Sequence, residues 1–189
     1  MMRKIRCILL LLLMGGLLIC PAFAAASFPD VNGYEEFAVA VEYVNKAGIM
    51  FGDNNGNFNP YKTVTRAEMA TIVCRMLNVD RDLTASTRFT DVPTGHWANK
   101  YVGKAASLGI VNGYGGGKFG PSDDVTYEQA VTMVVRAFGG EPEAKELGNY
   151  PDGYLALADK YNLLEGVSAK KGEPLSRADI AIIIYNCMS

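Results

Sequence analysis

A short pattern occurs three times in this chain, and it limits the possible folds more than any other feature. Each copy places Thr or Ser three residues before Glu, Gln or Asp, directly ahead of an apolar run. This spacing is typical of a capping box, in which two side chains at a helix start accept hydrogen bonds from backbone N–H groups. The copies cover residues 64–70, 125–130 and 175–180. We therefore predict three helices that begin at Thr65, Thr126 and Ser176.

The pattern belongs to a longer repeat with a period of 61 residues. An aromatic residue two places before Asp occurs at Phe28, Phe89 and Tyr150. The same step relates pairs in the first two copies: Gly52 and Gly113, Phe58 and Phe119, Pro60 and Pro121. A fixed period over many positions indicates a repeat protein. We predict copies at 28–88, 89–149 and 150–189, the last one shortened by 8 residues in its first half and by 3 before Ser176.

Each copy reads as helix, Gly-rich loop, helix. The first helices are expected at about 34–46, 97–108 and 154–161, where apolar residues recur at helical spacing. One Phe in each of the first two loops, Phe58 or Phe119, is expected to fill the core. A two-helix unit of this size cannot bury its apolar face alone, so the copies should pack on one another. The prediction is an all-α fold with six main helices.

The amino terminus predicts secretion. Basic residues, an apolar run from Cys7 to Cys20 and small residues follow one another as in a signal peptide, which we assign to residues 1–24. No later stretch approaches the length of a membrane span. The rest of the chain keeps 15 Lys and Arg against 20 Asp and Glu, which argues against nucleic acid or anionic lipid as the partner. Cys74 and Cys187 are expected as buried thiols, with a disulfide as the alternative.

Capping does not explain Arg66 and Arg177, which follow the first residue of two of these patterns. A cation in the first helical turn meets the positive end of the helix dipole and is disfavoured there. Beside free N–H groups, such an Arg would form a pocket for a carboxylate or phosphate. Replacing both by Ala is then expected to remove binding and leave the fold intact.

These motifs resemble the S-layer homology domain family. Its hallmarks are an opening Phe-x-Asp-Val, a Gly-Ile/Val-x-x-Gly stop, a Gly-x-Phe-x-Pro loop and a Thr-Arg-Ala-Glu helix start. The 28–88 copy has all four. The second has Tyr127 in place of the Arg, and the third has Tyr150 in place of the Phe and lacks the loop Phe. The resemblance covers residues 28–189.

The resemblance implies a three-pronged helical assembly with pseudo-threefold symmetry. It also implies an anchor that holds a secreted bacterial protein to a secondary cell wall polysaccharide on peptidoglycan, often one with a pyruvylated sugar, in grooves between copies. A pyruvate ketal presents a carboxylate, which suits Arg66 or Arg177. The faces of sugar rings suit Trp97 or Tyr127, although a lone Trp is as often a packing residue.

Four further residues complete the candidate binding set. Close approach of a ligand to the loop backbone suits Gly52 and Gly113. Asp30 and Asp91 either contact the ligand or bond the adjacent turn. Tyr127 cannot replace a guanidinium, so at most two grooves should bind a charged group. The first copy has the complete motif set, which favours a groove that includes Arg66.

Other function classes receive less support. A wall hydrolase would need a pair of acids in a cleft, and Glu68 and Asp179 are already assigned to helix caps. A wall-coating protein that assembles by itself is the second alternative. The loop at 53–57 departs from the calcium-loop spacing, so no metal site or cofactor is predicted. The sequence does not identify a cargo protein.

Overall fold

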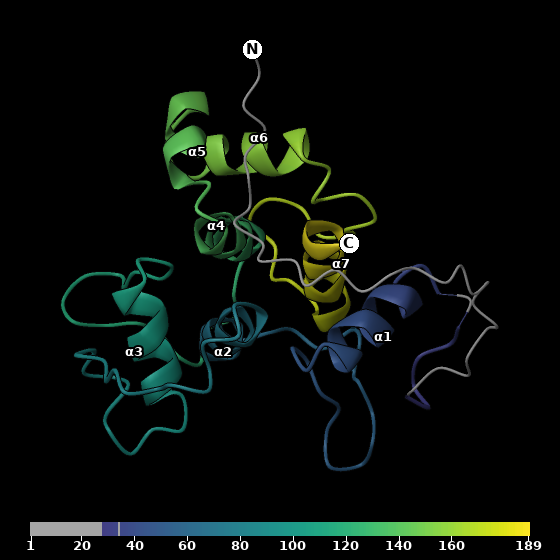
Figure 1. The fold of residues 1–189 in the computed structure, drawn as a ribbon, viewed down its shortest axis with the longest axis horizontal. Coiled ribbons are helices and arrows are strands. Elements are labelled where there is room, and N and C mark those ends of the chain that lie inside the picture. The colour runs from purple at the N-terminus through teal and green to yellow at the C-terminus, as the bar shows by residue number, and fades with distance from the viewer. Residues whose placement is uncertain (1–27, 34) are drawn as a thin grey trace, which may run out of the picture.

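The computed structural model describes residues 28–33 and 35–189 and is all-α, as the sequence predicts. The described part contains seven helices and only isolated β-bridges. The helices are α1 (Ala38–Lys46), α2 (Arg66–Met76), α3 (Asn99–Ser107), α4 (Tyr127–Ala137), α5 (Glu141–Leu147), α6 (Asp152–Lys160) and α7 (Arg177–Met188). In Figure 1, α2, α4 and α7 lie at the centre, and the other helices surround them. The signal peptide assigned to residues 1–24 lies outside the described residues.

The recurring pattern starts the three central helices. At α2, Thr65 Oγ1 accepts from Glu68 N at 3.3 Å, and Glu68 Oε2 accepts from Thr65 N at 2.8 Å. Ser176 and Asp179 form the same capping box at α7. The capping box predicted for α4 is wrong, because the Oγ1 atom of Thr126 is buried and has no hydrogen-bond partner among the described residues. The α4 helix begins at the predicted place without that cap.

The residues just before the central helices form a closed ring of backbone hydrogen bonds. Val125 N donates to Val64 O at 2.8 Å, Leu175 N to Val125 O at 3.1 Å, and Val64 N to Leu175 O at 3.1 Å. All three side chains are fully buried. Each donor and acceptor in the ring is therefore satisfied away from water, which an apolar centre requires. Three parts of the chain that are distant in sequence meet at this point.

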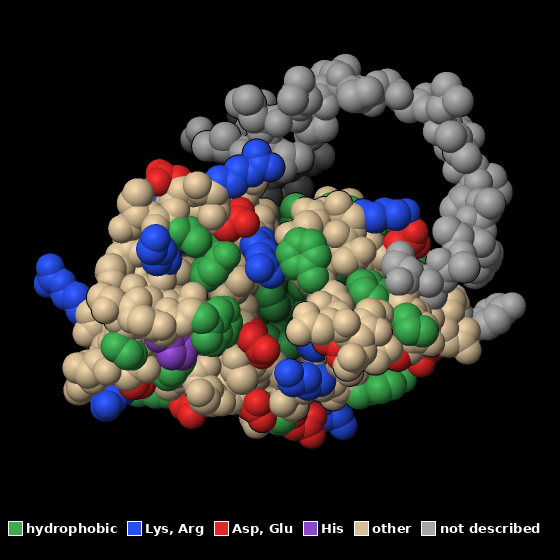
Figure 2. Space-filling view, turned by 90° about the horizontal axis from the view of Figure 1, so that it is seen from below, with side chains coloured by type: hydrophobic (Ala, Val, Ile, Leu, Met, Phe, Trp, Pro, Cys, Tyr) green, Lys and Arg blue, Asp and Glu red, His purple; other side chains and the backbone are tan. Residues whose placement is uncertain are grey.

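The outer helices pack against central helices from other parts of the chain. α3 packs on α2, α6 on α4, and α1 on α7, so the first and last helices are in contact. This arrangement explains how short two-helix units bury their apolar faces. Figure 2 shows the molecule from below. On this face a hollow lies between two lobes of the surface, and hydrophobic and basic side chains border it.

The outer helices differ in detail from the sequence prediction. α1 and α3 begin at Ala38 and Asn99, later than expected, and α6 begins at Asp152, two residues earlier. Their N-cap residues make no side-chain cap bond within the described structure, so no cap residue marks these starts in the sequence. Phe58 and Phe119 are fully buried, which confirms that they fill the core.

The seventh helix, α5, is missing from the six-helix prediction. It lies at the end of the 89–149 segment and packs against α6 of the 150–189 segment, which lacks 8 residues relative to the other two. A side chain on Gly153 would lie 2.1 Å from the carbonyl oxygens of Ala144 and Gly148, so only glycine permits this close contact. The short α5 sequence contains Pro142 and lacks a long apolar stripe. The spacing of apolar residues therefore does not predict this helix.

The described residues contain no helix that is both long and apolar enough to cross a membrane. They also contain no cluster of three or more His, Cys, Asp or Glu residues suited to a metal ion. Cys74 carries a free, buried thiol whose Sγ donates to Tyr101 O at 3.5 Å. Burial raises the pKa of this thiol to about 11, so it stays protonated at neutral pH.

Candidate functional site

Arg66 is one of the most deeply buried charged residues in the described structure, with 4% of its surface exposed. Its Nε donates to Phe119 O at 2.9 Å and its Nη2 to Asn112 O at 2.9 Å. Its Nη1 donates to Gln129 Oε1 at 3.0 Å. The guanidinium also lies 4.4 Å from the ring centroid of Tyr114. Arg66 therefore fastens the loop of the 89–149 segment to the start of α2.

Arg177 fastens the loop of the 28–88 segment in the same way. Its Nε donates to Phe58 O at 2.7 Å and its Nη2 to Phe51 O at 2.6 Å. These acceptors lie 61 residues before those of Arg66. The argument that the first-turn Arg residues lack a structural role is therefore wrong. Their role in ligand binding remains a prediction.

The helix starts also lack the free N–H groups that the anion argument requires. Arg66 N donates to Asp123 O and Ala67 N to Pro121 O, at 2.9 and 3.2 Å. At α7, Arg177 N and Ala178 N donate to the carbonyls of residues 62 and 60, each at 2.9 Å. Carbonyls of a neighbouring segment thus occupy the sites where an anion would bind. An anion at these places must be held by side chains instead.

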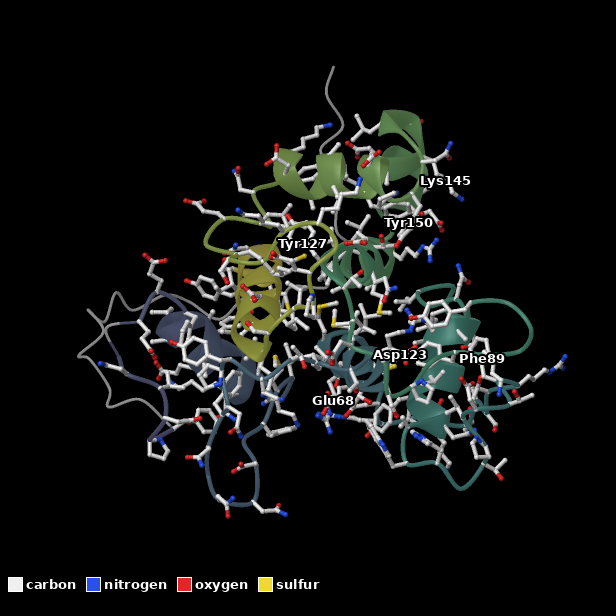
Figure 3. The ribbon with its side chains drawn as sticks, turned by 180° about the vertical axis from the view of Figure 1, so that it is seen from behind. Glu68, Phe89, Asp123, Tyr127, Lys145 and Tyr150 are labelled. Atoms are coloured by element: carbon white, nitrogen blue, oxygen red, sulfur yellow. The ribbon has the colours of Figure 1, made fainter. Side chains whose placement is uncertain are left out.

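A cavity of about 260 Å³ lies beside Arg66, between α4 and the loop that follows α3. Its wall includes Arg66, Asn112, Tyr114, Gln129, Arg136 and Tyr150. We call it the Arg66 cavity. Figure 3 shows the labelled Tyr150 beside α4 and near α5, whereas Tyr127 lies on the other side of α4, toward α7. The cavity is therefore built from three distant parts of the chain.

The sequence prediction missed Arg136, the second cation of the Arg66 cavity. Its Nη2 lies 3.2 Å from Glu141 Oε1 and 3.4 Å from Tyr154 Oη. The Nη1 atom donates to Asn112 Oδ1 at 3.1 Å when the amide oxygen faces it. Arg136 stands 61 residues after Arg75, a recurrence that was present in the sequence. It was overlooked because Arg in the last turn of a helix is ordinary and predicts no ligand.

The Arg66 cavity contains unsatisfied hydrogen-bonding atoms. Three buried side-chain atoms in the described residues have no hydrogen-bond partner, and two belong to its wall: Arg136 Nε and Thr132 Oγ1. Thr132 is only 4% exposed. An unpaired buried donor is costly, typically about 1 to 3 kcal/mol, and calls for an explanation. Both residues line the cavity, while these two atoms themselves are enclosed by protein.

Two tyrosines on the cavity wall are exposed, Tyr114 by 56% and Tyr150 by 53%. Burial raises the pKa of Tyr150, with Glu128 as a further cause, while Arg66 and Arg136 act in the opposite direction. Burial also lowers the pKa of Arg66. The nearby side chains of Tyr114, Asp123, Tyr150 and Asp91 partly oppose this effect. Arg66 still stays charged at neutral pH because the ordinary pKa of Arg is far above it. The cavity thus combines cations, phenol rings and an amide.

Several predicted site residues do not line the Arg66 cavity. Asp30 accepts from Phe58 N and Asn59 N, and Asp91 from Phe119 N and Gly120 N, so both carboxylates bond the loop turns. Whether they also contact a ligand is untested.

The glycines have a packing reason. A side chain on Gly52 would lie 2.6 Å from the Phe28 ring, and one on Gly113 would lie 2.3 Å from Lys118 O. Gly113 lines the Arg66 cavity, whereas Gly52 does not. Of the eight predicted residues, the cavity therefore brings together Arg66 and Gly113.

Trp97 and Tyr127 lie outside the cavity wall as the described residues define it. Trp97 is 59% exposed just before α3 and stacks on His96, with ring centroids 5.8 Å apart. Tyr127 begins α4, and its backbone N–H donates to Glu173 O at 2.8 Å. Burial raises the pKa of its phenol. A sugar contact at either residue stays a prediction.

Comparison with known families matches two parts of the chain to one model. Residues 27–70 and 88–131 match the S-layer homology domain. The matched segments include the Thr-Arg-Ala-Glu start of α2 and most of the cavity wall up to Gln129. The S-layer homology match therefore covers the first two of the three copies predicted from the period.

Curated relatives of the chain include surface and wall proteins. A cell surface protein of Thermoanaerobacter kivui is 36% identical over 168 residues, 86% of this chain and 21% of that protein. A middle cell wall protein of Brevibacillus brevis is 32% identical over 151 residues, covering 78% of this chain and 14% of the relative. A cellulosome-anchoring protein of Acetivibrio thermocellus is 28% identical over 151 residues, which cover 76% of this chain and 33% of that protein. The chain spans a third or less of each relative.

Proposed function

We propose that this chain anchors itself to the bacterial cell wall by binding an acidic wall saccharide in the Arg66 cavity. The protein is located at the cell surface or in the cell wall, in line with its two S-layer homology segments and its surface-protein relatives. A relative named as a cellulosome-anchoring protein favours attachment to the wall, a role that needs no catalysis. The polymer is proposed to be a secondary wall polysaccharide, with pyruvylated sugars as its acidic units.

The two arginines of the Arg66 cavity carry this proposal. Arg66 and Arg136 both line its wall, and their guanidiniums are hydrogen-bond donors with a positive charge. A pyruvate ketal offers two carboxylate oxygens beside a sugar ring. Such a group would satisfy the donors with charge-assisted hydrogen bonds, which are the stronger kind. A neutral sugar would bring no negative charge toward Arg66, whereas Arg136 already has Glu141 as a partner.

The proposed architecture is a pseudo-threefold assembly of three copies, with 150–189 as a shortened third. The ring of bonds among Val64, Val125 and Leu175 supports it, as does the cyclic packing of α3 on α2, α6 on α4 and α1 on α7. The matching contacts of Arg66 and Arg177 support it further. We also propose that residues 1–24 direct secretion and are removed.

Two alternatives receive less support. A wall hydrolase would need a free pair of acids, and Glu68 and Asp179 are used in capping boxes. A wall-coating protein that assembles by itself would not need the unpartnered donors of the cavity. No observation in the described residues favours either alternative over the anchor.

The test is binding of the full chain to purified cell walls before and after mild acid removes pyruvate ketals. Arg136→Gln should weaken binding roughly 10- to 150-fold, because one charge-assisted contact is worth about 1.5 to 3 kcal/mol. Arg75→Gln is the matched control, since Arg75 is the equivalent residue of α2 and should have less than about a 2-fold effect.

A second control separates charge from structure. Glu141→Gln removes the acid that pairs with Arg136 and leaves the guanidinium in place. It should retain wall binding if the cation itself contacts the ligand. Equal binding by wild type and Arg136→Gln, or equal binding to walls with and without ketals, would overturn the proposed function.

A further inference from the structure

Tyr150 occupies a position that has a packing role elsewhere in the repeat. The equivalent residues are Phe28 and Phe89, which pack on the loop residues Phe58 and Phe119 with ring centroids 5.3 and 5.4 Å apart. The 150–189 segment has no Phe in its shortened loop. Tyr150 therefore lacks the ring on which its counterparts pack.

Tyr150 is instead part of the wall of the Arg66 cavity. It is 53% exposed, whereas Phe28 is 8% exposed. Its ring meets Tyr154 edge to face, with centroids 6.4 Å apart, so it is supported from α6. Arg66, Arg136 and Tyr114 line the same cavity wall. An exposed, supported ring beside two cations is a suitable platform for the apolar face of a sugar.

A second tyrosine extends this platform. Tyr114 occupies the position that Asp53 has in the first copy, 61 residues earlier, so the two copies differ here as well. The guanidinium of Arg66 lies over its ring at 4.4 Å, which holds the phenol in place. More than half of Tyr114 stays exposed. Tyr114 and Tyr150 therefore place two exposed phenols on the wall of the Arg66 cavity.

We infer that Tyr150 is a specificity-determining residue of the Arg66 cavity, which stacks on the sugar ring whose acidic substituent the arginines bind. This inference rests on the proposed function. It makes the C-terminal segment part of a site whose cations come from the first two segments. The ligand class becomes a cyclic acidic sugar, because a small carboxylate such as free pyruvate has no ring for Tyr150 to contact.

The test uses the full chain and two probes, a methyl hexoside with a 4,6-pyruvate ketal and free pyruvate. Calorimetry compares wild type with Tyr150→Leu, which keeps apolar bulk and removes the ring. Affinity for the hexoside should fall roughly 2- to 12-fold, the worth of an aromatic contact. Tyr150→Phe should bind within about 2-fold of wild type, since the ring remains. Proton NMR should show upfield shifts of the sugar ring protons with wild type and their loss with Tyr150→Leu.

The outcomes separate the two proposals. If neither wild type nor any variant binds the hexoside, the proposed function fails and the inference with it. If wild type binds, Arg136→Gln does not, and Tyr150→Leu matches wild type in affinity and NMR shifts, only the inference is overturned. Thermal unfolding of Tyr150→Leu checks that it is folded, and Tyr150→Phe tests the ring without loss of packing.

Discussion

Arg66 and Arg177 bond the same two carbonyl positions of their respective loops. Their guanidiniums also stand over the equivalent rings, at 4.6 Å from Phe119 and 4.5 Å from Phe58. The surroundings differ. Gln129 lies beside Arg66, and its equivalent on the Arg177 side is Glu68, an acid that raises the pKa of Arg177 against the effect of burial.

A second difference is in the loops. Tyr114 stands where the other loop has Asp53, another acid coupled to Arg177. Acids lie near both arginines, including Asp123 and Asp91 near Arg66. At the two positions that differ, however, the Arg177 side has acids and the Arg66 cavity has an amide and a phenol. The comparison teaches that the shared Arg fixes the loop in both places, and we propose that the residues that vary between copies determine whether an anion is accepted.

The largest expected effect is the loss of stability when each Arg is removed. Arg66→Ala should lower the free energy of unfolding by about 3 to 5 kcal/mol, because two loop carbonyls lose a charged donor. Arg177→Ala should cost about 1.5 to 3 kcal/mol, because its side chain is more exposed and water can replace it. Urea unfolding of the two variants measures both. A loss below about 1 kcal/mol for Arg66→Ala would contradict the structural role and restore the earlier expectation of an intact fold.

The sequence predicted the three central helices because their starts are encoded locally. Thr65 and Ser176 carry complete capping boxes, and the side-chain spacing is visible without any tertiary contact. Thr126 shows the limit of this reasoning. Its partner Gln129 bonds Arg66 instead, a choice made by a residue 63 positions away. Tertiary contacts therefore overrode a local rule in the 89–149 segment, which supplies most of the cavity wall.

The site was predicted less well than the fold. Arg66 was found because it violates the dipole rule, but its partner Arg136 obeys that rule and gave no signal. The helix α5 supplies Glu141 to Arg136, and no period predicts a helix that occurs once. Residues that differ between the copies, such as Tyr150, form contacts that the shared motif does not predict.

A medium effect is expected when the cavity is given the acid of the Arg177 side. Gln129→Glu places a carboxylate beside Arg66 and should weaken binding of the ketal hexoside roughly 10-fold, about 1.4 kcal/mol. The same change completes a capping box with Thr126 and should raise the free energy of unfolding by about 0.5 to 1 kcal/mol. Calorimetry and urea unfolding measure the two effects. Gln129→Ala is the control for lost hydrogen bonding, and a Glu variant that binds like wild type would show that the difference between the two sides is not electrostatic.

The smallest effect concerns acid sensitivity of the loop that forms the cavity wall. Burial by itself would raise the pKa of Asp91, but hydrogen bonds from Gly120 N and Phe119 N outweigh it, and the pKa is lowered from 3.8. Because the folded pKa is depressed, this stabilisation is present above about pH 4 and is lost as the pH falls through the folded value.

Asp91→Asn should therefore cost about 1 kcal/mol at neutral pH and reduce the pH dependence of unfolding below pH 4. It should also weaken hexoside binding about 2- to 3-fold, since the loop that carries Tyr114 is less firmly held. Asp30→Asn is the matched control, because Asp30 stands 61 residues before Asp91, accepts from Phe58 N and Asn59 N in the other loop, and should leave binding unchanged. Unfolding curves from pH 2.5 to 7 and calorimetry at pH 7 measure both variants. Equal loss of binding in both would mean that the two loops support one common site, and the contrast between Arg66 and Arg177 would no longer hold.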